Sequence, residues 1–466
     1  MSNLQGKSRN GAGWGVTFLV LVLLVVLVAL VRSATSREGP TIIFKKLPKG
    51  LSQRTELVVG AQDEKHNVKA LAVEVVQEGQ VVHQVAMAFS ARPHRWWKFW
   101  SRGPVSTAIW TVPVGHEVIP GLKDGRATLR ITALSDSWGR FFRGGRGEAV
   151  LELPVRLAPP QVEVLTSQLH IHQGGCDLVL FKVSPGTIES GVEVGDFFFP
   201  SWPVKQSLPE TRLCVFAYAY NVDASTPARL VARDDAGNET LANFTYQVFP
   251  KNFHSDTITL THEFMNRVVP PIMSQTPDLR DQGSLLKNFL EVNGQLREID
   301  ARLLVEFSKH TSPTFRWSEP FIRIPSKTEA NFADHRTYMY NGQAVDHQTH
   351  LGFDLAGVEH MPVAAANDGE VVFAGFLGIF GNAVVIDHGC GLQSLYGHMS
   401  SFAVKAGDQV RRGQVIGRSG QTGLAAGDHV HFTILLDGIP VNPAEWWDSH
   451  WIHERIEVKL QPYAQP

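Results

Sequence analysis

The sequence has little of what marks several common classes of protein. Only 3 of its 466 residues are cysteine, which excludes a disulfide-rich scaffold. The formal net charge of −2 and the pI near 6.8 exclude the strongly basic surface that binds nucleic acid, so we expect no nucleic-acid partner. The chain is not short of apolar residues, at 43%, and it contains 41 glycines and 26 prolines. This composition indicates a globular, turn-rich protein, and its length allows about three domains.

Two pairs of polar residues begin like metal motifs and are incomplete. His262-Glu263 starts as in H-E-x-x-H, but Asn266 stands where the second histidine is needed. His170 and His172 form an H-x-H pair with no carboxylate motif beside it. We therefore expect no functional metal at either place.

A complete set of metal-binding side chains lies further along the chain. It consists of His350 and Asp354, then His398, then His429 and His431. Imidazole nitrogen and carboxylate oxygen suit zinc, and a catalytic zinc keeps three protein ligands and one open position. Five candidates exceed this need, so the surplus histidines are available for proton transfer.

Spacing indicates how these residues share a site. Residues 429–436 are rich in β-formers and predict a strand, in which His429 and His431 point to the same face. His350 and Asp354 are four residues apart and share a face in a strand or a helix. Gly352 between them favours a strand or loop and allows backbone to approach closely beside a metal.

These motifs resemble the lysostaphin-type zinc endopeptidases, also called LytM domains. That family carries H-x-G-x-D, Y-x-H and H-x-H in this order, and the resemblance covers residues 317–447. By this resemblance the ligands of Zn²⁺ are His350, Asp354 and His431. His398 and His429 are implied to flank the metal and carry the proton traffic.

The resemblance also implies a fold and a function. We expect an antiparallel β-sheet peptidase domain over residues 311–450 that hydrolyses peptide bonds in peptidoglycan stems or cross-links. One alternative is a non-catalytic LytM-like regulator that binds and activates a cell-wall amidase. Another is a peptidase that processes an envelope protein. The regulators have usually lost zinc ligands, so the complete set favours the enzyme.

Further residues near the motifs receive weaker assignments. We interpret His347, His360 and His388 as surface groups or supporting neighbours, and Cys390 as a small buried residue. Five aromatic residues fit either a substrate groove or the core, namely Trp317, Tyr338, Tyr340, Phe376 and Phe380. Asn331, Asp334 and His335 could reach a metal from upstream and gate the site, although simple strands there are the favoured interpretation.

An apolar, uncharged run near the start predicts a membrane anchor over residues 14–31. Lys7 and Arg9 precede it, which predicts a cytoplasmic segment over residues 1–13. A cleaved signal peptide is the competing interpretation, but residues 30–34 lack an A-x-A site. We therefore expect a single-pass protein of the bacterial inner membrane, with its bulk in the periplasm.

The middle of the chain predicts two β modules and a helical arm, so the whole protein is expected to be mainly β. Regular turns indicate a β-sandwich over residues 33–158. Residues 160–249 resemble an immunoglobulin-like module, in which Cys176 and Cys214 could bridge. These modules are expected to act as spacers or to bind envelope proteins.

The helical arm is predicted over residues 250–310 and is followed, after the peptidase domain, by a tail over residues 451–466. Apolar residues recur at three- and four-residue steps across residues 278–310. Ser284 is suited to cap the first helix, and Asn293-Gly294 predicts a break into two helices.

Overall fold

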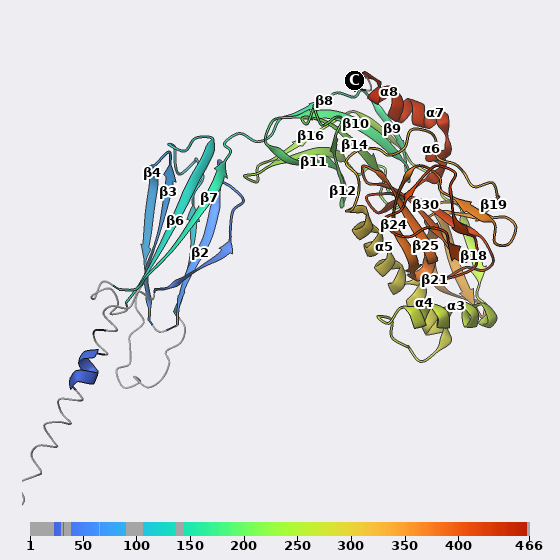
Figure 1. Ribbon diagram of the computed structural model, residues 1–466, viewed down its shortest axis with the longest axis horizontal. Coiled ribbons are helices and arrows are strands. Elements are labelled where there is room, and N and C mark those ends of the chain that lie inside the picture. The colour runs from blue at the N-terminus through green and yellow to red at the C-terminus, as the bar shows by residue number, and fades with distance from the viewer. Residues whose placement is uncertain are drawn as a thin grey trace, which may run out of the picture. The chain divides into compact units, whose positions relative to one another are not determined.

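The computed structural model describes residues 23–28, 31, 39–64, 66–89, 106–136 and 144–463. The chain is mainly β, with most strands paired antiparallel (Figure 1), which confirms the predicted fold class. The chain divides into two compact units, each of which has most of its contacts within itself. The first contains residues 1–159 and 234–238, and the second contains residues 160–233 and 239–466.

The predicted membrane anchor falls largely outside the described residues, which include only 23–28 and 31 of the span 14–31. A helix needs about 20 apolar residues to cross a bilayer. Within the described parts of the chain, no helix reaches the length and apolarity that crossing requires. This finding contradicts the predicted single-pass inner-membrane location, and we correct that prediction here.

The first unit is built from two antiparallel sheets. Its strands are β1 (Thr41–Lys46), β2 (Glu56–Asp63), β3 (Val68–Gln77), β4 (Gln80–Ala88), β5 (Ser106–Pro113), β6 (Gly125–Ser135) and β7 (Arg146–Val155). They are ordered β1-β2-β5 and β4-β3-β6-β7. Buried Leu57 and Val59 on β2, and Leu71 and Val73 on β3, alternate with less buried neighbours, as expected for sheets with one face in a core.

The second unit begins with two four-stranded sheets and one parallel strand pair. Its first strands are β8 (Val162–Val164), β9 (Leu169–His172), β10 (Cys176–Val183), β11 (Thr187–Val194), β12 (Phe197–Pro200), β13 (Trp202–Pro203), β14 (Thr211–Ala217), β15 (Ala228–Asp234), β16 (Glu239–Ala242) and β17 (Tyr246–Phe249). The sheets are ordered β13-β14-β10-β8 and β12-β11-β15-β16, and β17 pairs with β9. Cys176 and Cys214 are buried free thiols, so no disulfide joins them.

The peptidase region contains an eight-stranded antiparallel sheet. Its strands, with those of two smaller sheets, are β18 (Ser255–Thr259), β19 (Lys327–Ala330), β20 (Asp334–Tyr340), β21 (Gln343–His350), β22 (Phe353–Ala356), β23 (Pro362–Ala364), β24 (Gly369–Leu377), β25 (Gly381–Gly389), β26 (Leu392–Gly397), β27 (Ser401–Phe402), β28 (Gln409–Val410), β29 (Val415–Arg418), β30 (Val430–Leu436) and β31 (Ile439–Val441). The large sheet is ordered β19-β22-β30-β26-β25-β24-β28, and β31 pairs with β30. β18-β20-β21 form a separate sheet. Strands β25, β26 and β30 are buried along nearly their whole length, which makes them the centre of the domain.

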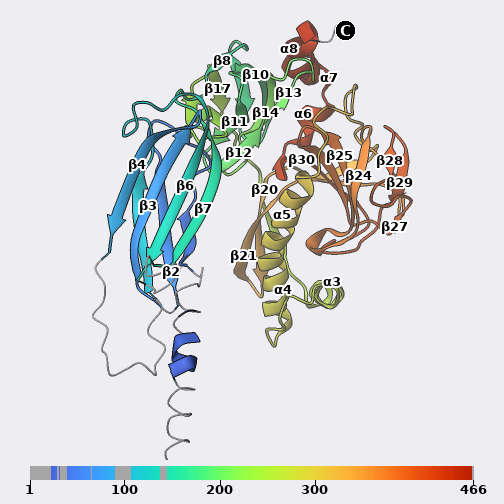
Figure 2. The same cartoon turned by 60° about the vertical axis from the view of Figure 1, so that its left-hand side comes forward.

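Helices lie between β18 and β19 in the sequence, a short helix lies between β24 and β25, and further helices follow β31. They are α3 (His262–Gln275), α4 (Leu285–Asn293), α5 (Gln295–Ser308), η2 (Gly378–Phe380), α6 (Pro443–Trp447), α7 (Ser449–Ile452), η3 (His453–Glu457), α8 (Val458–Leu460) and η4 (Gln461–Tyr463). The predicted cap and break are confirmed, because the Ser284 hydroxyl accepts from Lys287 N and Gly294 separates α4 from α5. α5 contacts η2, β24 and β31 and runs along this part of the molecule (Figure 2). α3 lies within the predicted helical arm, but no helix was assigned to residues 262–275, where Pro270 and Pro271 would normally break one.

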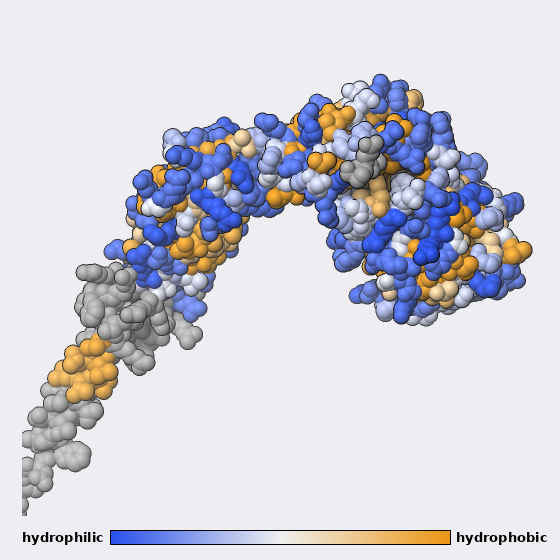
Figure 3. Space-filling model, turned by 45° about the horizontal axis from the view of Figure 1, so that its top comes forward, coloured by the Kyte–Doolittle hydropathy of each residue, from blue (hydrophilic) through white to orange (hydrophobic). Residues whose placement is uncertain are grey.

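One apolar cluster of the second unit extends across two parts that the sequence analysis treated as separate domains. Buried Phe181 and Phe216 of the four-stranded sheets belong to the same apolar cluster as Phe432 and Trp446 of the peptidase region. The surface of this unit, in contrast, is mostly hydrophilic with small scattered apolar patches on the face shown in Figure 3. A buried polar contact joins the two parts, in which Cys176 N donates to the Glu445 carboxyl at 2.9 Å.

Glu445 makes the stability of this unit depend on pH. Burial raises the pKa of its carboxyl from 4.5 to about 8. Between these two values the unfolded chain has lost the proton that the folded chain retains. Stability is therefore expected to fall as pH rises from about 4.5 to about 8, by at most a few kcal/mol from this residue, at about 1.4 kcal/mol per pKa unit.

We predict that Glu445→Gln reduces this dependence, because the amide keeps an oxygen for Cys176 N and cannot ionise. Thermal unfolding at pH 5 and pH 8 measures the effect. The wild type is expected to lose more stability between the two pH values than the variant. Burial also raises the pKa of Asp300 to about 7 and that of Asp437 to about 8, and both residues are retained in the variant, so their contribution is the same in the two proteins. Equal losses in the two proteins contradict the prediction.

Candidate metal centre

Three strands bring His350, Asp354 and His431 together. His350 ends β21, Asp354 lies on β22, and His431 lies on β30 directly opposite Asp354 in the antiparallel register. His350 Nε2 lies 2.9 Å from Asp354 Oδ1 and 3.0 Å from His431 Nδ1. His431 Nδ1 lies 3.0 Å from the same Asp354 oxygen. The three candidate ligands thus meet at one point.

The hydrogen bonds on the far side of each ring determine which nitrogen carries the proton. His350 Nδ1 lies 2.9 Å from the Asn331 carbonyl, which can only accept, so Nδ1 is the donor and Nε2 presents a lone pair. Thr433 Oγ1 donates to the Leu351 carbonyl at 2.8 Å and accepts from His431 Nε2 at 3.0 Å. His431 Nδ1 therefore also presents a lone pair. When both rings are neutral, these two nitrogens and Asp354 Oδ1 are three acceptors that face one another.

This arrangement fits a divalent cation. Three facing lone pairs repel one another unless a positive charge lies between them. Ligand atoms at about 2.0–2.2 Å from a tetrahedral zinc ion lie about 3.3–3.6 Å apart, so the observed separations need to widen by only a few tenths of an ångström. Burial lowers the pKa of His431 to about 4, which favours the neutral form that binds metal. Burial acts to raise the pKa of Asp354, but the neighbouring histidines hold it well below its ordinary value.

Gly352 is required by this packing. A Cβ atom at this position would lie 2.5 Å from Thr433 Oγ1 and 2.6 Å from His431 Nε2. Both atoms belong to the contact that fixes the His431 ring. The absence of a side chain therefore allows the 350–354 segment to approach β30.

His398 and His429 lie next to the three ligands. His398 follows β26 with φ of 63°, and its Nδ1 donates to the Thr422 carbonyl at 2.8 Å. His429 Nδ1 donates to the Gly427 carbonyl at 2.9 Å, and its Nε2 lies 3.4 Å from Asp354 Oδ1. The two rings are 4.7 Å apart between centroids. Burial and the neighbouring histidines lower the pKa of His398. Burial also opposes charge on His429, but Asp354 raises its pKa.

Three supporting contacts were missed by sequence reasoning. Arg336 on β20 donates to Asp354 Oδ2 at 3.0 Å and leaves Oδ1 facing the histidines. The Asn331 carbonyl orients His350, and Thr433 orients His431. Thr433 follows His431 by two residues in a strand, so the two side chains point to the same face, and their contact could have been predicted from this spacing. The other two contacts depend on long-range pairing that spacing does not reveal.

The gate considered as an alternative is not formed by the side chains proposed for it. Asp334 accepts from Asn331 N at 2.9 Å, and His335 is exposed on β20. Residues 327–330 and 334–340 form strands β19 and β20, as the simpler interpretation expected. His335, Asp334 and the Asn331 side chain do not line the cavity described below.

None of the remaining candidates belongs to the group of three candidate ligands. His170 and His172 contact the Phe249 ring, while His347 and His360 are exposed. His388 is fully buried and is not a surface group, because its ring contacts the Asp368 carbonyl and the Ser394 hydroxyl. Cys390 is buried, as expected. Among the aromatic candidates Tyr338 and Phe380 line the cavity, while Trp317, Tyr340 and Phe376 pack in apolar clusters.

A cavity of about 430 Å³ opens beside the three ligands. This volume lies within the range of about 300–1,000 Å³ typical of ligand sites. All five predicted site residues line it, together with Arg336 and side chains of α3 and α5. The metal centre is therefore accessible to a ligand, and helices upstream of it form part of the cavity wall.

Comparison with known proteins agrees with this geometry. Residues 348–443 match Peptidase family M23. The C-terminal part of the chain therefore carries a LytM-type peptidase domain, and the fold resemblance seen in the sequence is confirmed for this part.

Several curated proteins are similar over the same region. The DD-carboxypeptidase/endopeptidase Mpg of Neisseria meningitidis serogroup B is 45% identical over 94 residues, which cover 20% of this chain and 22% of Mpg. The peptidoglycan DD-endopeptidase ShyA of Vibrio cholerae is 43% identical over 93 residues, covering 20% and 22%. An uncharacterised metalloprotease of Haemophilus influenzae is 34% identical over 128 residues, covering 26% of each chain. The alignments thus span about a quarter or less of each relative.

We predict that Gly352→Ala reduces metal binding, because its methyl group would displace the contact between Thr433 and His431. The zinc content of the protein is measured after dialysis against a series of zinc concentrations, which gives the affinity. We expect the affinity to fall at least tenfold, equivalent to about 1.4 kcal/mol. Gly121→Ala is a suitable control, since a Cβ there meets no atom within 4 Å. Unchanged zinc content in a folded Gly352→Ala protein contradicts the prediction.

Proposed function

We propose that the protein is a zinc-dependent endopeptidase that hydrolyses peptide bonds in peptidoglycan stems or cross-links. The observation that carries this proposal is the convergence of three lone pairs on one point, beside two further histidines in the same cavity. Similarity to ShyA, which is named as a peptidoglycan DD-endopeptidase, supports the substrate class, and Mpg is named as a DD-carboxypeptidase/endopeptidase. The intact set of five residues favours an enzyme over a regulator that binds an amidase.

In this proposal His350, Asp354 and His431 hold the zinc ion. When bound, zinc supplies a Lewis acid that polarises the scissile carbonyl and lowers the pKa of water. The chain itself supplies proton transfer. His398 and His429 each donate from Nδ1 to a backbone carbonyl, which makes Nε2 the proton-accepting atom of each neutral ring. His429 Nε2 also lies 3.4 Å from Asp354 Oδ1, which stabilises the ring once it is protonated. Either Nε2 can take the proton of the attacking water, and either can return a proton to the leaving amine.

Arg336 and Thr433 orient the ligands in this scheme. The guanidinium of Arg336 holds Asp354 Oδ2, so the carboxylate is directed through Oδ1. Thr433 holds His431 in the tautomer with a free Nδ1. Such supporting contacts keep ligands in position and typically change metal affinity or activity about 10–100-fold when removed.

The proposed activity is tested by incubating the purified full-length protein with peptidoglycan sacculi and analysing the products by mass spectrometry. New peptide termini within stems or cross-links are expected. Treatment with a chelator should abolish their formation, and one equivalent of zinc should restore it. Intact peptides after incubation with the zinc-loaded protein contradict the proposal. Stimulation of an added amidase would then favour the regulator.

Separate variants distinguish ligands from proton carriers. His431→Ala is expected to lose zinc, whereas His398→Ala and His429→Ala should retain it. The latter two should lose about 10²–10⁴-fold in kcat, which is the usual contribution of general acid–base groups. Zinc analysis and turnover on the same preparations provide both measurements. Near-normal turnover by either variant would show that its histidine has only a structural role.

A further inference from the structure

One wall of the cavity carries an arginine that the proposed reaction does not use. Arg297 on α5 lines the same cavity as His350, Asp354 and His431. It lies outside residues 348–443, which match Peptidase family M23. Arg336, the other arginine in the lining, is already occupied by Asp354. Arg297 is therefore the cavity cation that remains to be explained.

A buried asparagine fixes the position of Arg297. Nε and Nη2 of Arg297 donate to Asn293 Oδ1 at 3.1 and 3.0 Å. Asn293 is fully buried, and its Nδ2 donates to Asp346 Oδ2 at 2.7 Å. Asp346 also accepts from the Gln348 amide at 3.2 Å. This chain of contacts ties α4 and α5 to β21, so the guanidinium is held against the cavity instead of moving freely in solvent.

Among the described residues, Arg297 interacts with a carboxylate only at longer range, through the electrostatic effect of its charge on Asp300 of the same helix. Within the described parts of the chain, no ion pair joins it to an acid, and its hydrogen bonds go to the neutral Asn293 amide. Asp300 lies one turn further along α5, but its carboxylate accepts from Ile379 N at 2.9 Å. Glu298 also lines the cavity and is exposed, and it forms no ion pair with Arg297 either. A partly buried guanidinium that forms no direct ion pair favours an anionic ligand.

We propose that Arg297 binds a free carboxylate of the substrate and selects peptides that carry one near the scissile bond. This inference rests on the proposed peptidase function, since peptidoglycan stem peptides carry free carboxylates. Arginine suits the task because its planar guanidinium matches a carboxylate and remains charged at any physiological pH. Nη1 has no partner within the described structure, so at least one donor is available to the ligand.

The test compares two probes that differ only in charge. Dimeric muropeptides are released from sacculi with a muramidase and used as isolated or after amidation of their carboxylates. Equilibrium binding is measured on the full-length protein after removal of metal with a chelator. Removing the metal matters, because a carboxylate could otherwise bind directly to zinc.

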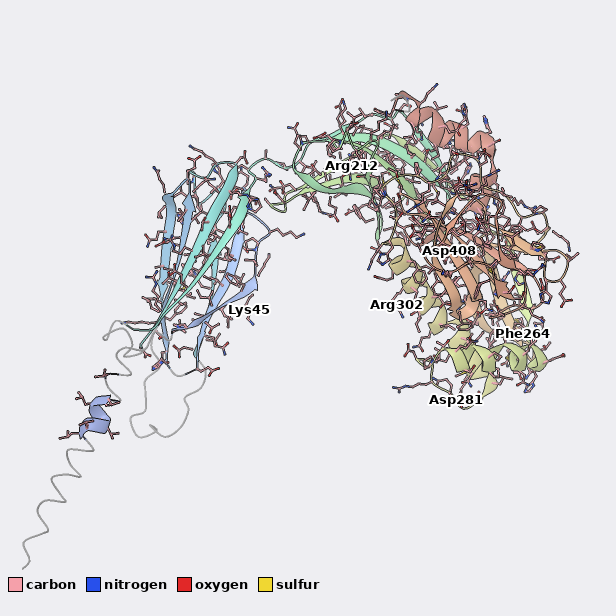
Figure 4. The ribbon with its side chains drawn as sticks, in the orientation of Figure 1. Lys45, Arg212, Phe264, Asp281, Arg302 and Asp408 are labelled. Atoms are coloured by element: carbon pink, nitrogen blue, oxygen red, sulfur yellow. The ribbon has the colours of Figure 1, made fainter. Side chains whose placement is uncertain are left out.

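We expect the wild type to bind the carboxylate form at least tenfold more tightly than the amidated form. Arg297→Gln should bind both forms equally, at the affinity of the wild type for the amidated form. Arg297→Lys should show intermediate discrimination, because it keeps the charge without the planar donors. Arg302→Gln is the matched control. Arg302 lies on the same helix (Figure 4), is exposed and does not line the cavity, so its loss removes the same charge without changing discrimination.

Turnover by the zinc-loaded protein separates this proposal from the proposed function. In Arg297→Gln, KM for the carboxylate form should rise at least tenfold while kcat on the amidated form stays unchanged. Discrimination retained by Arg297→Gln, absent from the wild type, or lost equally in Arg302→Gln overturns the role of Arg297. So does failure of both probes to bind. Selective binding without any cleavage by the wild type instead supports Arg297 as a carboxylate site and overturns the peptidase proposal.

Discussion

The arrangement of the active region depends on one electrostatic constraint, which is the meeting of three acceptor atoms about 3 Å apart. His350, Asp354 and His431 come from three strands, so their lone pairs can meet only if those strands hold a fixed register. A carbonyl fixes the first ring, Arg336 fixes the carboxylate, and Thr433 fixes the second ring. Each contact prevents a rotation or tautomer that would relieve the repulsion. The protein thus maintains locally unfavourable electrostatics that a cation relieves.

The cluster of His350, Asp354 and His431 could be predicted from the sequence because its chemistry resides in side chains at short, regular spacings. H-x-H in a strand and H-x-G-x-D around a close approach are local patterns, and both lead to the observed geometry. The contacts that orient these side chains could not be predicted in this way. Asn331 and Thr422 contribute backbone carbonyls, which any residue type would offer. Arg336 reaches Asp354 only because β20 pairs with β21 in a particular register, and no local pattern determines that register.

The helices also show that local features could be predicted from the sequence and long-range contacts could not. Periodicity, Ser284 and Gly294 sufficed to predict α4 and α5, because amphipathicity and capping are local properties. They did not reveal that Arg297 lines the cavity, since an apolar stripe indicates which face is buried but not what it packs against. α3 was not assigned within the predicted arm, because proline is a reliable breaker only when packing does not compensate for the lost hydrogen bond. The shared core of the second unit was missed for a related reason, because buried strands look alike whichever partner they contact.

The two proposals assign chemistry and substrate choice to different parts of this chain. The residues that match Peptidase family M23 supply the five metal-site and proton-transfer candidates, whereas α4, α5 and β20 lie upstream of that match. Arg336 acts from this upstream region on a ligand, and Arg297 acts from it on the cavity. The alignments with curated relatives cover about a quarter or less of this chain. The sequence identity over such a segment describes the similarity of the candidate reaction centre. Residues of the cavity wall outside the segment can differ without changing that identity. Two proteins with the same five residues can therefore share a reaction and still differ in the peptides that they accept.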